Sequence, residues 1–319
     1  MSDKSGRTAF HETTQPPGGA IHSVSAIAER ANAIRNLYTK YGVTLNTQSG
    51  VGQLMDAVRE IDDDQRHRRI QHRPKAVLLV AQLLKLTKRE VLSCLQEMNN
   101  PKRILERLTQ GSLDPYVLNK HNFAKDALWE LEFCGWLRES GLGAELAQPD
   151  GSLAISGRQI SIECKRHYSH ESIEKALSKA RKQIQESSHL GIVALDLEHL
   201  YQPVPPQIVA LSQLHIADML GQRNADFRAR HARHINKTLV DARTLLVVYS
   251  AGGLFRSLDA PVPQPFPYRR WGVCEGEALD STVRPVLIEM YARIMRKRHP
   301  DASSNSDRGG PLPPVDSPA

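Results

Sequence analysis

Two carboxylates and a lysine stand close together in residues 149–166, PDGSLAISGRQISIECKR. Mg²⁺ in proteins is held through one or two carboxylates together with water and substrate phosphates. A lysine beside such an ion can orient or help deprotonate a water molecule and can neutralise charge that develops on a phosphate. Asp150, Glu163 and Lys165 therefore have the residue types needed to hydrolyse a phosphodiester bond. The Cys164 carbonyl lies between the last two side chains, so we expect it within reach of the same ion.

The pattern of this segment predicts the hairpin that brings the three side chains together. Residues 160–165 alternate between apolar and polar, which is the period of a half-buried strand, and residues 153–155 form a shorter strand before it. We expect Gly157 and Arg158 to form the loop. The resulting polar-face pairs are Asp150 with Lys165, Ser152 with Glu163 and Ala154 with Ser161. A slip by one residue would turn Asp150 to the other face, and the alternative interpretation is an ordinary Glu–Lys pair on a surface hairpin.

With the pattern P-D-G…I-S-I-E-C-K-R, the chain resembles the PD-(D/E)xK nuclease superfamily, which includes restriction enzymes, Holliday-junction resolvases and repair nucleases. The resemblance covers residues 122–200, well under half of the chain. It implies an α/β fold with a restriction-endonuclease-like mixed β-sheet core flanked by helices. It also implies Mg²⁺ or Mn²⁺ as the cofactor, with Asp150 and Glu163 as metal ligands. Lys165 would position or activate the attacking water, and DNA is the expected substrate because the family mostly cuts DNA.

The helix predicted over residues 123–140 is the expected source of a further metal ligand. Glu130 shares one face of this helix with Ala127 and Cys134. An unpaired carboxylate among apolar groups is costly to bury, and a metal site beneath it would explain the placement. The resemblance implies an acid near the metal on this helix, so Glu130 is the candidate for a second ion or a metal-bound water. Glu132 is the alternative, and both residues could instead be ordinary surface acids.

The helix predicted after the hairpin, residues 172–186, carries a buried apolar stripe. The resembled family often has a Gln or Lys here that touches the site, and this points to Gln183, on the edge of the stripe, as the residue that orients Lys165 or the phosphate. The helix is also basic, which suits a phosphate backbone but equally suits a solvated face. Before it, His167 and His170 lie in a polar loop and are candidates for substrate contact or for simple solvation.

Further elements follow from periodicity and from turn residues. We expect strands at residues 191–197 and 244–250, the second ended by Gly252 and Gly253, and a short edge strand at 271–274, after an extended Pro-rich loop at 261–267. Helices are expected at 208–220, 226–241 and 283–297. Five more are expected near the N-terminus, at 23–38, 51–61, 76–86, 88–98 (with Thr87 as its cap) and 101–108.

These elements divide the chain into four predicted parts. Residues 1–20 form a flexible leader, 21–120 a helical N-terminal domain, 121–299 the nuclease-like domain and 300–319 a disordered tail. The helical part carries no repeat and no clear helix-turn-helix pattern. It could bind DNA, bind a partner protein or extend the packing of its neighbour.

Composition sets the remaining expectations. The chain has 42 Lys and Arg against 35 Asp and Glu, a net charge of +7, which is compatible with nucleic acid without proving it. Basic clusters lie at residues 66–75 and 228–234. The cysteines lack C-x-x-C or Cys/His spacing, which argues against zinc and disulfides and fits a reducing cytoplasm. We find no signal peptide, and the longest apolar run, 76–84, is too short for a membrane span.

The sequence therefore favours a cytoplasmic, metal-dependent DNA endonuclease that acts as a hydrolase on phosphodiester bonds. The alternative is a non-catalytic nucleic-acid-binding or scaffold protein on a nuclease-like fold. A third reading is an unrelated α/β protein in which E-C-K is a chance match. A homodimer and a complex with a partner protein both remain open. Motifs for a P-loop, a dinucleotide fold or a zinc protease are missing from the sequence.

Overall fold

The computed structural model describes residues 13–14, 24–66, 74–114, 117, 122–147, 150–187, 189–201, 209–240, 243–259, 265–276, 281 and 283–296. Within these ranges the protein is a mixed α/β structure, as the sequence predicts. The expected leader, tail and Pro-rich loop lie mainly or wholly outside the described residues, and so does most of the basic cluster at 66–75. No helix in the described part of the chain is long and apolar enough to cross a membrane.

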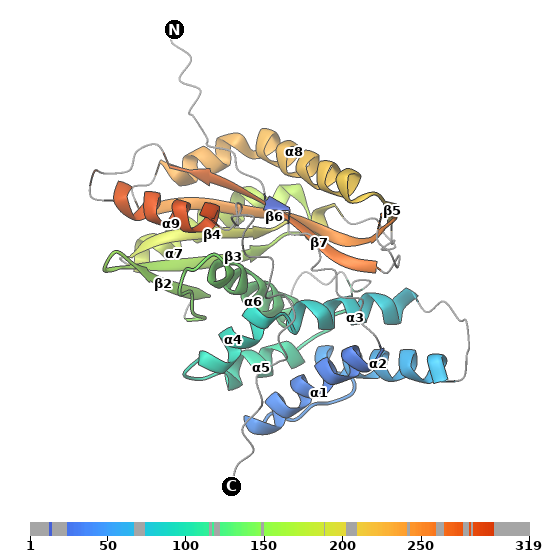
Figure 1. Ribbon diagram of the computed structural model, residues 1–319. Coiled ribbons are helices and arrows are strands. Elements are labelled where there is room, and N and C mark those ends of the chain that lie inside the picture. Colours follow the sequence, from blue (N-terminus) through green and yellow to red (C-terminus); the bar gives the residue numbers. More distant parts are fainter. Residues whose placement is uncertain are drawn as a thin grey trace.

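One mixed β-sheet forms the centre of the molecule (Figure 1). Its main strands are β2 (Gly151–Ile155), β3 (Arg158–Arg166), β4 (Leu190–Asp196), β6 (Thr244–Ser257) and β7 (Pro265–Glu275). The strand order is β1-β7-β6-β4-β3-β2, where β1 is the two-residue strand Thr13–Thr14, and the three-residue β5 (Val209–Leu211) pairs with β6. Strands β3, β4 and β6 are parallel, whereas the pairs β2–β3 and β6–β7 are antiparallel.

Helices cover both faces of this sheet (Figure 1). On one face, α7 (Ile173–Ser187) and α8 (Gln213–Leu239) enclose an apolar cluster with β4 and β6. The other face packs against α6 (Phe123–Glu139) and α9 (Arg284–Arg296). Two short 3₁₀ turns, His170–Ser172 and Glu198–Leu200, follow β3 and β4. The order α6, β2, β3, α7, β4 is the order of helix, hairpin, helix and strand that we expect from the sequence.

The N-terminal helices lie below α6 and the sheet (Figure 1), and α3 packs against β6 and β7 as well as against α6. They are α1 (Val24–Lys40), α2 (Gly50–Arg66), α3 (Pro74–Leu86), α4 (Arg89–Glu97) and α5 (Lys102–Thr109). One continuous apolar cluster joins Ile34 and Leu105 of these helices to Phe133 of α6 and Ile160 of β3. The core therefore crosses the boundary expected at residue 120, and the division into two domains there stays a prediction.

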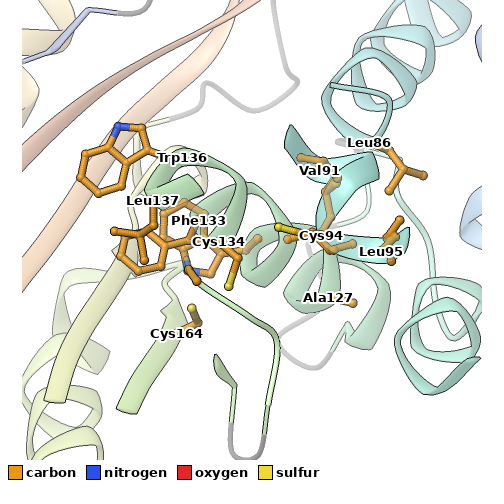
Figure 2. Close-up of a cluster of buried hydrophobic side chains, with 14 of the residues drawn as sticks. Leu86, Val91, Cys94, Leu95, Ala127, Phe133, Cys134, Trp136, Leu137 and Cys164 are labelled. Carbon is orange, nitrogen blue, oxygen red and sulfur yellow. The ribbon is translucent and has the colours of Figure 1, made fainter. Parts of the chain in front are cut away.

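Helix α6 is the element that joins the two parts. Its residues from Ala124 to Leu137 are buried, with the exception of the half-buried Asp126. Figure 2 shows its side chains between Cys94 and Leu95 of α4 on one side and Cys164 of β3 on the other. A helix that is apolar around most of its circumference is a core element rather than a surface one. Its start is fixed by Asn122, whose side chain accepts a hydrogen bond from the Lys125 N–H at 3.1 Å.

The hairpin register differs from the expected one by two residues. Gly151 pairs with Ile162, Ser152 with Ser161 and Ile155 with Arg158, so the loop consists of Ser156 and Gly157. Both loop residues have positive φ, 49° and 72°, which matches a two-residue hairpin turn. The expectation that Gly157 and Arg158 form the loop was wrong, because a serine takes the left-handed conformation. A shift of two preserves the faces, so Asp150 stays on the polar side but next to Glu163.

Several other boundaries differ from expectation for identifiable reasons. Strand β6 runs through Gly252 and Gly253, which pair with β7 instead of ending the strand, and β7 begins already at Pro265 and is paired on both edges. Helix α8 is one helix where two were expected, and the Asn224 side chain near its middle bonds to the Arg270 carbonyl and the Ala251 N–H of the sheet. Residues 209–211, expected in a helix, form β5.

The cap expected at Thr87 is also absent. Lys88 occupies the cap position of α4 without a side-chain bond, and the Thr87 hydroxyl instead donates to the Leu83 carbonyl at 2.8 Å. The Thr87 side chain is therefore used by the end of α3 rather than by the start of α4.

The four cysteines are all buried and free, in agreement with the expected lack of disulfides. Burial raises the pKa of the Cys134 and Cys164 thiols well above the ordinary value. Cys134 of α6 and Cys164 of β3 thus behave as small apolar groups, and they pack between the helix and the back of the hairpin (Figure 2).

Candidate active site

The structure brings Asp150, Glu163 and Lys165 together at the end of the hairpin. The Lys165 Nζ lies 2.8 Å from Glu163 Oε2 and 3.3 Å from Asp150 Oδ2. All three side chains are largely shielded, with exposures of 17% for Asp150, 0% for Glu163 and 19% for Lys165. Glu163 and Lys165 meet because side chains alternate along a strand, so that residues 163 and 165 point to the same face of β3.

The backbone of β3 fixes the position of Asp150. Asp150 precedes the first residue of β2, and its Oδ2 accepts a hydrogen bond from the Cys164 N–H at 2.8 Å. In an extended strand the N–H and C=O of one residue point to the same edge. The Cys164 carbonyl is therefore directed toward the side of Asp150, beyond the last ladder pair of β2, as the sequence led us to expect.

Glu163 carries an unsatisfied buried oxygen. Its Oε2 is paired with Lys165, but its Oε1 has no hydrogen-bond partner within the described residues. Burial raises the pKa of the Glu163 carboxyl, and Lys165 opposes that shift. A buried carboxylate oxygen without a partner is costly, so the arrangement favours a cation at this point.

The oxygen set fits a hard divalent cation that keeps part of its water shell. It consists of the Asp150 and Glu163 carboxylates and the Cys164 carbonyl, and one or two carboxylates with water are the usual protein ligands of Mg²⁺. The described residues contain no group of three or more His, Cys, Asp or Glu side chains placed to hold a metal. Burial alone would lower the pKa of Lys165, but Asp150 and Glu163 raise it above the ordinary value, so Lys165 is the cation between the carboxylates.

Glu130 lies close to this cluster but is already paired. Both of its oxygens accept from the guanidinium of Arg107, at 2.5 and 2.7 Å. Burial raises the pKa of Glu130 to about 7, Arg107 acts against the shift and the nearby Asp150 adds to it. A role as a metal ligand would require the Arg107 pair to open. The partner residue, on α5, is separated from Glu130 by 23 positions, and no local pattern in the sequence indicates it.

Glu132, the alternative acid of α6, belongs to a different cluster. Its Oε2 lies 3.1 Å from Arg269 Nη2 on β7. The same guanidinium donates to Asp196 at 3.0 Å and to Glu198 at 2.8 Å, and it lies over the ring of Trp129. Of the two candidates on α6, Glu130 is therefore the one beside Asp150.

This second cluster, which we call the Arg269 network, is nearly closed to solvent. Lys85 of α3 donates to Glu198 at 2.7 and 2.9 Å, and Arg166 donates to Asp196 at 2.9 Å. Every charged side chain in it is at most 7% exposed. Burial alone would raise the pKa of Asp196, but Arg269 and Arg166 hold it well below the ordinary value. One feature of the sequence indicates this network: Asp196 interrupts an apolar run, and a buried acid needs a partner.

Gln183 does not contact Lys165 in the structure. Its side chain is half-buried on α7, and its Oε1 has no hydrogen-bond partner in the part of the chain that is described. Lys179, four residues earlier on the same helix, lowers the pKa of Glu163 electrostatically and so lies nearer the cluster. In the sequence it is one of several basic residues on the helix, and spacing does not single it out.

Asp126 is a further acid that the sequence left unnoticed. It lies one turn before Glu130 on α6, and burial raises its pKa while Arg166 and Arg107 oppose the shift. Among the loop histidines, His167 is buried, with its Nδ1 at 3.1 Å from the Ser172 hydroxyl, so simple solvation is wrong for it and contact with substrate stays a prediction. His170 is instead stacked on His231 of α8, with 2.9 Å between their ring nitrogens.

One hollow adjoins the cluster, and a second lies between the helices of the α7 side. The first, of about 340 Å³, lies between α4, α5, α6 and the segment before β2, and both Asp150 and Glu130 line it. The second, of about 540 Å³, lies between α7 and α8, and Lys179 lines it. The first is called the Asp150 pocket below and the second the α7–α8 groove.

Comparisons of this chain with protein-family models, with curated proteins and with solved structures find no match. What the chain does must therefore be inferred from the geometry of its own residues.

Proposed function

We propose that this protein is a metal-dependent nuclease that hydrolyses phosphodiester bonds in DNA, built on a restriction-endonuclease-like core. The observation that carries the proposal is the meeting of Asp150, Glu163 and Lys165 at one end of a hairpin, with one buried oxygen of Glu163 left without a partner in the described residues. The order α6, β2, β3, α7, β4 supports the fold assignment, because it is the order that the resembled family implies.

In this proposal Asp150, Glu163 and the Cys164 carbonyl hold Mg²⁺ or Mn²⁺. When bound, the ion would polarise a phosphoryl oxygen and lower the pKa of a bound water. Lys165 then no longer has to balance the two carboxylates alone. Its ammonium can hold the attacking water and neutralise charge on the phosphate. Gln183 and Glu130 are supporting candidates, Gln183 for orienting the phosphate and Glu130 for holding a metal-bound water once Arg107 releases it.

The α7–α8 groove supports a nucleic-acid substrate. Five cations and two acids line it, in addition to His234 and three neutral residues. The cations are Lys175, Lys179, Arg181, Lys182 and Lys237. A groove with this excess of positive charge favours a phosphate backbone, and Lys179 in its lining lowers the pKa of the Glu163 carboxyl electrostatically.

The test is cleavage of plasmid, linear duplex and single-stranded DNA with Mg²⁺ or Mn²⁺, with RNA alongside. Wild type is compared with Lys165→Ala and with Lys40→Ala, the matched removal of an exposed lysine on α1 that lines neither hollow. We expect metal-dependent cutting by wild type and by Lys40→Ala but not by Lys165→Ala. Equal cutting by Lys165→Ala would contradict the site assignment.

The second candidate function is a nucleic-acid-binding scaffold without catalysis. It is favoured by the absence, within the described residues, of a group of three metal-binding side chains and by Lys165, which already pairs with both carboxylates. Calorimetric titration with Mn²⁺ separates the two functions. The scaffold predicts no binding that depends on Asp150, whereas the nuclease predicts binding that Asp150→Asn abolishes.

A further inference from the structure

We propose that the Asp150 pocket receives a single unpaired nucleobase of the strand whose phosphate lies at the hairpin cluster. The inference rests on the proposed function, because it takes the reacting phosphate to lie beside Asp150. It assigns a role to the helical N-terminal region, which supplies one wall of the pocket from α4, α5 and the turn between them.

Position and size support this assignment. Asp150 and Glu130 line the pocket together with Leu146 and Ala147 of the segment before β2. A group that enters the pocket therefore lies directly beside Asp150. The volume of about 340 Å³ falls at the lower end of the range of about 300–1,000 Å³ that is typical of small-ligand sites. It suits one ring system rather than an extended chain.

The charges of the lining point to a neutral group. Three arginines are set against four carboxylates, and the pairs Arg107–Glu130 and Arg138–Glu97 are formed within the lining itself. A phosphate would meet no excess of positive charge here, whereas the α7–α8 groove offers one. The α7–α8 groove therefore has the excess positive charge that suits the phosphate backbone, whereas the Asp150 pocket lacks this excess and suits a base.

The remaining lining residues complete the chemistry of a base site. Met98, Ile104 and Leu146 offer apolar surface to a ring face, and Asn99 and Asn100 offer amide donors and acceptors to its edge. Proteins read unstacked bases in this way, through ring faces and hydrogen bonds to base edges. A base that is paired within a duplex cannot enter the pocket, so the preferred DNA carries an unpaired nucleotide at the reacting phosphate.

The experiment compares two DNA probes with the same phosphates. One is a fluorescent duplex with a single bulged nucleotide, and the other carries an abasic residue at the bulge. Anisotropy titrations use the full chain in EDTA, so that no step depends on cleavage. We expect wild type to bind the bulged base about tenfold more tightly than the abasic probe, as base contacts of this kind provide.

Three variants locate the effect. Ala147→Trp fills the pocket from an exposed position and should bring the two affinities within about twofold, as should Asn99→Ala combined with Asn100→Ala. Lys182→Ala, in the α7–α8 groove, should weaken both probes equally. Equal affinity of wild type for the two probes, or an unchanged preference in the pocket variants, would overturn the proposal. A base preference in EDTA supports the pocket even where cleavage assays with Mg²⁺ fail, so the two proposals fail separately.

Discussion

The two groups of buried charges in this molecule are built from the same residue types but differ in the balance of their charges. The Arg269 network sets three cations, Arg269, Arg166 and Lys85, against the three carboxylates of Glu132, Asp196 and Glu198. Its charges are therefore balanced, although Arg166 Nη1 has no hydrogen-bond partner in the described residues. The hairpin cluster sets Lys165 against two carboxylates and leaves Glu163 Oε1 without a partner in the described residues. It is also the more exposed of the two, and a hollow opens beside it.

Under the proposed function, the difference separates a structural cluster from a functional one. A closed, balanced network holds elements together, and here it links α3, α6, β3, β4 and β7. The excess negative charge of the cluster at the end of the hairpin lowers the free energy of unfolding, and a bound cation can raise it again. Removing a charge should therefore lower activity at the hairpin and stability in the Arg269 network.

The largest effect is expected from Glu163→Gln. It keeps the shape of the side chain but removes the charge, so metal-dependent cleavage should fall by at least about 10³-fold, or roughly 4 kcal/mol in the barrier. The free energy of unfolding without metal should change by less than about 1 kcal/mol, because Lys165 keeps Asp150 as its partner and the cost of burying the Glu163 charge is removed. Single-turnover kinetics and urea unfolding measure the two quantities.

Glu29→Gln is the matched control, since Glu29 is an exposed acid on α1 that lines neither hollow. It should leave the rate of cleavage unchanged. If Glu163→Gln cuts DNA as fast as Glu29→Gln, the hairpin cluster is not the site of the chemistry.

In the Arg269 network the effect should fall on stability. Arg269→Met leaves Glu132, Asp196 and Glu198 without their shared partner, and the loss of one member of a buried pair costs about 3–5 kcal/mol. Urea unfolding of wild type and variant measures the loss, with the exposed Arg59→Met as the control. A loss of under about 1 kcal/mol would mean that the network does not hold the sheet to the helices.

The next effect depends on pH and concerns His167, which lies between the two clusters. Its main-chain N–H donates to the Asp196 carbonyl at 3.2 Å, and burial lowers the pKa of its ring to about 4. Because the folded pKa lies below the ordinary 6.5, its contribution to stability is complete above pH 6.5 and is lost as the pH falls to 4. The loss amounts to about 3 kcal/mol.

The measurement is the free energy of unfolding of wild type and His167→Asn between pH 7.5 and pH 4. The difference between the two proteins should shrink by this amount as the pH falls, because the asparagine does not titrate. A difference that stays constant with pH would show that His167 is not held in its neutral form.

The smallest effect is expected from Lys182→Ala. The ammonium lies 3.7 Å from Glu186, and the two side chains are 76% and 64% exposed. Such a pair contributes less than about 0.5 kcal/mol, so thermal unfolding should change little. A large loss of stability would show that an exposed ion pair in this protein contributes as much to folding as the buried pairs of the Arg269 network.

The sequence predicted the part of the site that depends on local pattern. Alternation over residues 160–165 placed Glu163 and Lys165 on one face, and the faces were correct although the register was two residues off. The register failed because Ser156 adopts a positive φ that is uncommon for a residue with a side chain.

Long-range pairs could not be read from the sequence. Arg107 with Glu130 and Lys85 with Glu198 join residues separated by 23 and 113 positions. Periodicity describes one element at a time, so it gives the face on which Glu130 lies but not the guanidinium that meets it. The preference between Glu130 and Glu132 needed the positions of α5 and β7.

The burial of α6 on nearly all sides has a consequence for the biosynthesis of the chain. The helix finds one set of its neighbours in the segment made before it and the other in the sheet made after it. A polypeptide that starts at α6 would expose the apolar side that α4 and α5 normally cover, and a nascent chain that has not yet reached β3 would expose the opposite side. We therefore expect both fragments to aggregate or to be retained by chaperones, and the intact chain to unfold in one cooperative transition.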